Sequence, residues 1–281
     1  MSTNPMVNAW LFIDGDNPPG VGYSDPSSSY QALIQNDVYQ SVDILFLAFF
    51  STVATTDGTY TIQMGSEATG IMQQIVADAR QNNPDIQIVA TLGYGSGTNI
   101  SKIFPDPSHP DSQSADAFAS NLVAFLQANG LNGLDLDWES PISDDTTREQ
   151  FATFVDAVGA AFGEQYYLTL SPAVATHLDA AAVNAHVDFI NLQLYSGFTF
   201  PSDFTALGID SSLFAYGANF VNGDQTAQGA YTDNTDNYGY PIYTVWQLNP
   251  GEFASAQAQQ QALYSLVFPS TAPAAVAAAT A

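Results

Sequence analysis

The chain has 281 residues, of which 46% are hydrophobic, and its 28 acidic residues against three Lys and Arg residues give a formal net charge of -25. This length and apolar content are sufficient for one large α/β barrel or for two ordinary domains. Nucleic acid and anionic membrane surfaces both need a cationic face, so the charge excludes them as expected partners and favours an uncharged substrate.

Eight short apolar runs alternate with helix-like stretches, which predicts βαβ units around a parallel sheet. The predicted strands are 8–14, 43–50, 86–93, 133–138, 166–172, 187–195, 213–218 and 242–248. The clearest helical patterns cover 67–81, 115–129, 146–162 and 252–267. We expect Ser114 to cap the second of these helices and Gly130 to end it.

Strands at roughly 30-residue spacing match a (β/α)8 TIM barrel, and a doubly wound sheet with fewer strands is the alternative. The connection 218–240 reads as a loop where a helix would be expected. We see no second core, so we predict a single barrel domain over residues 1–268. Residues 269–281 are low in complexity and are expected to be a C-terminal tail.

The segment LNGLDLDWES, residues 131–140, places three carboxylates at every second position: Asp135, Asp137 and Glu139. On a strand these side chains share a face, with Cα atoms roughly 6.6 Å apart from one to the next. Like charges at that spacing repel, which costs stability and shifts pKa values unless a function or a cation uses them. The run ends the fourth predicted strand, where a barrel places its active site.

Two other interpretations of the acid run are that it caps the next helix or binds calcium. An EF-hand loop needs Gly at its sixth position, which DLDWESPISDDT does not offer. The chain has no cysteine, and His109, His177 and His186 form no clustered pair. We therefore expect no disulfide, no metal site and no cofactor.

The stretch NGLDLDWE resembles the signature of glycoside hydrolase family 18, the chitinases and endo-β-N-acetylglucosaminidases, which is written Asp-Gly-x-Asp-x-Asp-x-Glu. It keeps the last three acids together with Gly133 and Trp138, and has Asn132 in place of the first Asp. The sixth predicted strand ends in FINLQLY, similar to the family's Gln-x-Tyr variant, and YTVWQL places a Trp where the family has one. The third strand, VATLGYGSG, is only partly similar to the family's Ser-x-Gly-Gly.

The resemblance implies a retaining hydrolase of β-1,4-linked N-acetylglucosamine, in which the substrate's own N-acetyl oxygen attacks the anomeric carbon. Glu139 would be the general acid, with its pKa raised by the adjacent Asp137. Asp137 would orient the acetamide and share a proton with Asp135, and Tyr195 would hold the acetamide oxygen.

The resemblance also implies further contacts with the substrate. Gln193 would assist Tyr195, Trp246 would form the apolar floor under the sugar, and Tyr94 would touch sugar at the edge of the cleft. The family's first acid supports the second, so Asn132 is expected to weaken the tuning of the acids' pKa values. The short connection between the last two strands leaves no room for the large inserted α+β lobe of some chitinases.

We therefore expect a chitinase-like enzyme that is monomeric and extracellular and binds chitin or an N-acetylglucosamine-containing oligosaccharide. The N-terminal MSTNPMVNAW lacks the parts of a signal peptide, so export would use a removed signal or another route. Three alternatives remain open. They are an endo-β-N-acetylglucosaminidase that acts on N-glycans, a non-catalytic carbohydrate-binding relative, and a barrel enzyme that uses the acids to hold magnesium.

Overall fold

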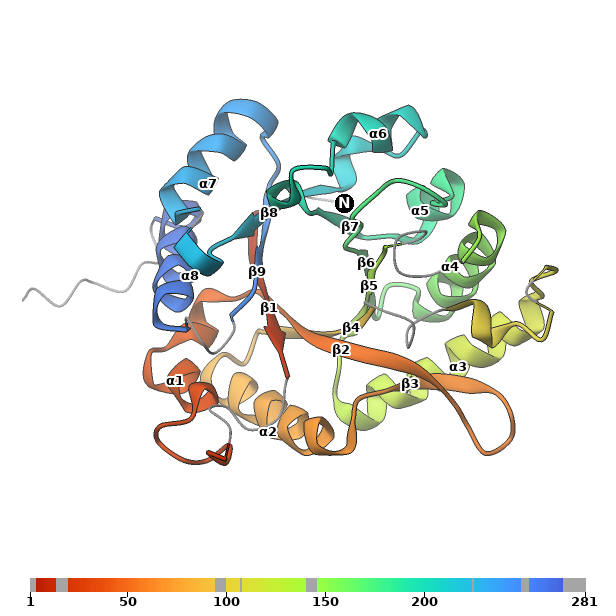
Figure 1. The fold of residues 1–281 in the computed structure, drawn as a ribbon, viewed down its shortest axis with the longest axis horizontal. Helices are drawn as coiled ribbons and strands as arrows, with labels where there is room; N and C mark the ends of the chain where they lie inside the picture. The colour runs from red at the N-terminus through yellow and green to blue at the C-terminus, as the bar shows by residue number, and fades with distance from the viewer. Residues whose placement is uncertain are drawn as a thin grey trace, which may run out of the picture.

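The computed structural model describes residues 4–13, 20–93, 100–106, 108–139, 146–223, 225–248 and 253–269. Eight parallel strands in these residues close into a barrel, because β1 pairs with β9 on one side and with β2 on the other (Figure 1). The barrel strands are β1 Met6–Phe12, β2 Ile44–Ala54, β4 Gln87–Gly93, β5 Gly133–Asp137, β6 Tyr167–Leu170, β7 Phe189–Leu192, β8 Phe214–Asn219 and β9 Ile242–Trp246. The predicted TIM barrel and its eight strands are confirmed.

One further strand, β3 (Tyr60–Gln63), was not predicted. It runs antiparallel to the end of β2 and forms a hairpin that projects away from the barrel (Figure 1). The carboxylate of Asp57 accepts hydrogen bonds from the backbone N–H and the hydroxyl of Thr59, and Gly58 takes a positive φ of 85°. These side-chain bonds close the turn, and a strand of four residues is too short to show a clear alternation.

Helices surround the barrel on its outer side (Figure 1). They are α1 Ser29–Gln35, α2 Ser66–Asn82, α3 Ser112–Asn129, α4 Arg148–Phe162, α5 Ala180–His186, α6 Pro201–Ala206, α7 Ala227–Asp233 and α8 Phe253–Val267. The four predicted helices are present. The expected cap of α3 is wrong, because Asp111 is the N-cap and its side chain accepts from the Ser114 N–H. Gly130 ends this helix as expected, with φ 65°.

The connection 218–240 was predicted to be a loop, and the structure corrects this. It contains α7, followed by a π-helical turn over Asn234–Tyr238. Thr226 caps α7 by accepting a hydrogen bond from the Gly229 N–H, and Ala227 and Ala230 are buried. A seven-residue helix that contains Gly has little stability of its own, so packing against α8 decides its conformation. The described residues between the end of β8 and the start of β9 form no strand, in agreement with the expected lack of an inserted α+β lobe.

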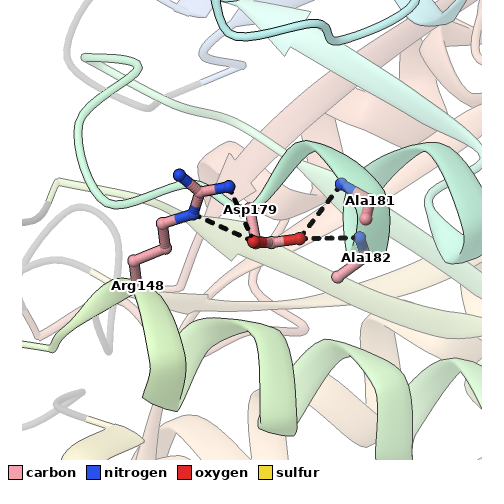
Figure 2. A network of polar contacts seen from close by, with 4 residues as sticks. All are labelled: Arg148, Asp179, Ala181 and Ala182. Atoms are coloured by element: carbon pink, nitrogen blue, oxygen red, sulfur yellow. Dashed lines mark hydrogen bonds and ion pairs between the residues drawn. The ribbon is translucent and has the colours of Figure 1, made fainter.

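An ion pair joins the start of α4 to the start of α5 (Figure 2). The Asp179 carboxylate accepts hydrogen bonds from Arg148 and from the backbone N–H groups of Ala181 and Ala182. Partial burial acts to raise the pKa of Asp179, but these hydrogen bonds outweigh it and the pKa is lowered. Arg148, one of the three Lys and Arg residues of the protein, therefore stabilises the contact between the starts of α4 and α5.

Two apolar layers hold the barrel together. The outer layer lies between strands and helices and includes large buried rings such as Phe118, Phe151 and Phe154. The inner layer fills the barrel with Trp10, Phe46 and other buried side chains. None of the described helices is long and apolar enough to cross a membrane. Residues 270–281 lie outside the described residues, so the C-terminal tail stays a prediction.

Candidate active site

Most of the predicted site residues meet at the carboxyl ends of the barrel strands. Asp137 ends β5 and Glu139 follows it, and both line a cavity of about 460 Å³. The cavity is also lined by Trp10, Phe12, Phe49, Ser171, Gln193, Tyr195, Trp246 and Gln247. Gln193, Tyr195 and Trp246 are therefore brought to the acids from β7 and β9, whereas Tyr94 lies outside the described residues.

Asp135 lies below the cavity and is fully buried. The hydroxyls of Thr169 and Ser171 donate to its Oδ1 at 2.7 and 2.8 Å. Its Oδ2 has no hydrogen-bond partner among the described residues. Burial raises the pKa of Asp135 to about 6, although nearby hydroxyls and the Asn191 amide act in the opposite direction; the hydroxyls are those of Thr169, Ser171 and Thr91. Asp135 therefore keeps a proton up to about pH 6, and Oδ2 is the oxygen that is free to carry it.

Asp137 is strongly perturbed by its surroundings. Burial raises its pKa well above the usual range, and the charges of Glu139 and Asp135 raise it further. The Gln193 amide donates to its Oδ1 at 3.2 Å, which opposes the rise. The same nitrogen donates to the Ser171 carbonyl at 2.9 Å, so the Gln193 side chain is held in place.

Tyr195 faces the same three carboxyls. Burial and then the charges of Asp137, Glu139 and Asp135 raise the pKa of its phenol. The phenol therefore keeps its proton and can act as a hydrogen-bond donor to a ligand. No Lys or Arg lines the cavity in the described part of the chain, so protonation rather than a cation relieves the repulsion between the acids.

Gly93 brings β4 very close to Asp137. The two residues are register partners in the sheet. A Cβ at Gly93 would collide with the Cβ of Asp137 and would lie 2.7 Å from its carbonyl oxygen. The absence of a side chain at position 93 is therefore required for Asp137 to take its position.

Gly93→Ala is expected to displace Asp137 and to lower the free energy of unfolding by about 1–3 kcal/mol, the usual cost of an overpacked site. Urea unfolding followed by circular dichroism measures this loss. The control is Gly65→Ala, because a Cβ at Gly65 would meet no atom within 4 Å. Equal stability of the two variants would show that the strands separate without cost at Gly93.

The aromatic wall of the cavity contains Trp246, which the resemblance named, together with Trp10 and Phe49, which were not predicted from the sequence. Trp10 contacts Trp246 edge to face with ring centroids 5.7 Å apart, and Phe49 lies 6.0 Å from Trp246. The peptide bonds Ala48–Phe49 and Trp246–Gln247 are both cis. These rings come from β1, β2 and β9. Phe49 and Trp246 stand near the ends of their predicted strands, which was the available signal, whereas Trp10 lies inside its predicted strand and gave none.

Asn132 lies at the opposite end of β5 from Asp137. Its Oδ1 accepts hydrogen bonds from the Ile88 N–H at 2.9 Å and from Arg80 at 3.2 Å. Its own N–H donates to the Ile88 carbonyl at 2.6 Å. Asn132 therefore joins the starts of two strands, and it is not among the groups that shift the pKa of Asp135 or Asp137. The expectation that Asn132 weakens the tuning of the acids stays a prediction, and the structure shows that Asn132 itself contributes nothing to their pKa values.

No group of three or more His, Cys, Asp or Glu side chains in the described residues is arranged to hold a metal ion. The cavity instead combines carboxyls, an amide, a phenol and aromatic rings. Such a lining can donate protons and hydrogen bonds to an uncharged ligand while the rings contact its apolar faces.

Comparison with known proteins gives consistent results. Residues 20–272 match the family model of glycosyl hydrolases family 18. Chitinase A1 of Niallia circulans is 29% identical over 135 residues, which cover 41% of this chain and 19% of that protein. Chitinase 1 of Aphanocladium album is 26% identical over 201 residues, which cover 64% of this chain and 46% of that protein. The chain thus spans less than half of the length of these relatives.

Solved structures share the fold at low sequence identity. A class V chitinase from Nicotiana tobaccum, in complex with NAG4, has a TM-score of 0.65 and 14% identity, covering 94% of this chain and 100% of that one. A chitinase-like agglutinin from Robinia pseudoacacia has the same TM-score and identity, covering 92% of this chain and 99% of that one. At this identity the likeness establishes the barrel fold alone.

Proposed function

The chain belongs to glycosyl hydrolase family 18, and we propose that it hydrolyses β-1,4-linked N-acetylglucosamine polymers of the chitin type with retention of anomeric configuration. One observation carries the proposal. Asp135, Asp137 and Glu139 converge on an aromatic-walled cavity that has no cation in its described lining. The relatives whose names describe chitinases add support.

In the first step, Glu139 would donate its carboxyl proton to the glycosidic oxygen. The bond between that oxygen and the anomeric carbon breaks, and the substrate's acetamide oxygen forms a bond to the same carbon. The product is an oxazolinium ring that carries the positive charge. The charge of Glu139 raises the pKa of Asp137, so the two acids hold a proton more readily than separate carboxylates would. In this proposal that proton lies on Glu139 before the step, as a general acid needs.

Asp137 would accept a hydrogen bond from the acetamide N–H and stabilise the positive ring. The phenol of Tyr195 would donate to the acetamide oxygen and hold it in line for attack, with Gln193 fixing the Asp137 carboxylate. In the second step the Glu139 carboxylate takes a proton from water, and the water oxygen forms a bond to the anomeric carbon. The bond between that carbon and the acetamide oxygen breaks, and its electron pair restores the neutral acetamide. Two displacements on the same carbon retain its configuration.

The test is to incubate the protein with chitin oligomers and, separately, with a high-mannose glycopeptide. We expect shortened oligomers by mass spectrometry, with the β-anomer as the first product by proton NMR. Cleavage of the glycopeptide alone would indicate an endo-β-N-acetylglucosaminidase. Binding of oligomers without any cleavage would indicate a carbohydrate-binding protein, as the name of the agglutinin relative suggests for that protein.

We place the protein outside the cell and in monomeric form as part of this proposal. A chitin-type polymer is too large to enter a cell, so an enzyme that cleaves it must meet it outside. The net charge of -25 makes copies of the chain repel one another near neutrality, which supports a monomer.

A second, apolar groove is formed by the loops after β6 and β7, which also contribute residues to the cavity. It is lined by Val174 and by the exposed rings of Phe198 and Phe200, which are 52% and 53% accessible. The Thr199 hydroxyl donates to the Ala173 carbonyl at 2.7 Å, so the loops after β6 and β7 are tied together. The same loops contribute Ser171 and Tyr195 to the cavity, so a polymer chain that leaves the cavity along them would meet these rings.

Replacing both Phe198 and Phe200 with alanine is expected to lower the rate on insoluble chitin about tenfold, since a lost aromatic contact of roughly 1.5 kcal/mol corresponds to that factor. The rate on a short soluble glycoside should stay unchanged, because such a substrate occupies only the cavity. Tyr238→Ala is the matched control, because Tyr238 is 38% accessible and lies in the π-helical turn before β9. Equal losses on both substrates would contradict the role of the groove.

A further inference from the structure

A chain of buried hydrogen bonds crosses the barrel from β9 to Asp135. Ser171 Oγ donates to Asp135 Oδ1 at 2.8 Å, and Asn191 Nδ2 donates to Ser171 Oγ at 3.1 Å. The Thr244 hydroxyl donates to Asn191 Oδ1, and Asn8 Nδ2 reaches Thr244 Oγ1 at 3.5 Å. Every member is at most 2% accessible, so bulk water competes little for these hydrogen bonds.

The chemistry of the groups sets the direction of each bond. Asp135 Oδ1 accepts, so the single hydroxyl proton of Ser171 must point to it. The oxygen of Ser171 then needs a donor, and only the NH2 group of Asn191 provides one in the described chain of bonds. The amide oxygen of Asn191 is consequently turned to Thr244, which has to donate. If the Asn191 amide were flipped, its oxygen would face the oxygen of Ser171. No proton would then lie between these two oxygens, and the hydrogen bond would be lost.

We propose that Asn191 and Thr244 are positioning residues, which act through Ser171 to direct the hydrogen bonds of the protein onto one oxygen of Asp135 and leave the other to hold a proton beside Asp137. Neither residue lines the cavity, so neither would touch the substrate. The Thr169 hydroxyl adds a second donor to the same oxygen, Oδ1. The inference rests on the proposed function in so far as this acid pair serves hydrolysis.

The pKa of Asp135 depends on this chain of hydrogen-bond donors because no cation lies near its carboxyl in the described residues. The titratable groups that face it are Asp137 and Glu139, from its own chain segment, and Tyr195 after β7. The side chains that reach it from β4, β6 and β7 are neutral hydroxyls and an amide, those of Thr91, Thr169, Ser171 and Asn191. Donors to the charged form of Asp135 oppose its desolvation, so weakening the chain of donors should make the acid harder to ionise.

The experiment compares Thr244→Val, which has a similar shape but no hydroxyl, with Thr244→Ser, which keeps the donor. Carboxyl carbon-13 NMR of the substrate-free protein follows the titration of Asp135 and Asp137. We expect Thr244→Val to move the apparent pKa of the pair upward by roughly half a pH unit or more, as the loss of one hydrogen bond would give. Thr244→Ser should titrate like the unaltered protein.

In hydrolysis assays Thr244→Val should move the acid side of the pH profile of kcat upward by a similar amount and leave KM within about twofold. An unchanged titration in Thr244→Val, or an equal shift in Thr244→Ser, would overturn the inference. If Thr244→Val does not fold, the double variant Thr244→Val/Asn191→Leu replaces both partners by apolar groups and is the one to titrate. A shifted titration in a protein without hydrolytic activity would refute the proposed function and leave the inference standing.

Discussion

Replacing Glu139 with glutamine is expected to lower kcat on chitin oligomers by about 10²–10⁴-fold, the usual contribution of a general acid. Glutamine has nearly the same shape as glutamic acid but has no acidic proton to give to the glycosidic oxygen. Affinity for the oligomers should change little, because the cavity keeps its aromatic and polar lining. Initial rates measured together with equilibrium binding, for example by calorimetry, separate these two quantities.

The matched control is Glu149→Gln, which makes the same chemical change at an exposed acid in the first turn of α4. This variant should retain the activity of the unaltered protein. A Glu139→Gln variant that keeps more than about a tenth of the activity would not fit general acid catalysis by this residue. The function would then need another proton donor.

Stability should fall as the pH rises from about 4 to about 6, because Asp135 has a raised pKa in the folded state. Its pKa is about 6 when folded, against roughly 3.9 in an unfolded chain. Between these values the folded protein holds a proton that the unfolded chain has lost, so unfolding becomes easier as the pH rises. A difference of about two units corresponds to roughly 3 kcal/mol at pH 7.

Asp135→Asn should remove this loss, because asparagine stays neutral and its oxygen can still accept from Thr169 and Ser171. The variant should match the unaltered protein near pH 4 and exceed its free energy of unfolding by about 2–3 kcal/mol at pH 7. Urea unfolding at the two pH values provides the measurement. Asp116→Asn removes an exposed acid on α3 and controls for the general loss of one negative charge. A parallel pH dependence in Asp135→Asn and the unaltered protein would contradict the assigned burial effect.

Much of the architecture could be predicted because it depends on local patterns. The apolar strands at regular spacing indicated the barrel, and the alternation of Asp135, Asp137 and Glu139 placed these acids on one face at a strand end. Gly130 ended α3 as its backbone freedom suggested. A strand's period of two and a helix's C-terminal glycine act over a few residues, so both are readable without tertiary information.

Local patterns failed where a partner distant in the chain decides the outcome. Helix α7 has weak propensity and depends on α8, and Asn132 looks like part of the acid signature but is bound by Ile88 and Arg80 at the other end of the strand. Its neighbours in sequence gave no sign of these contacts.

The sequence by itself therefore determined the barrel, the order of its strands and the face on which the three acids stand, because side-chain alternation is a property of the local backbone. Only the tertiary structure decided which residues complete the site. The aromatic wall comes from β1, β2 and β9, and the hydrogen bonds that orient Asp135 include a pair 236 residues apart, Asn8 and Thr244. Closure of the barrel brings such residues together, and no local periodicity encodes which of them will meet.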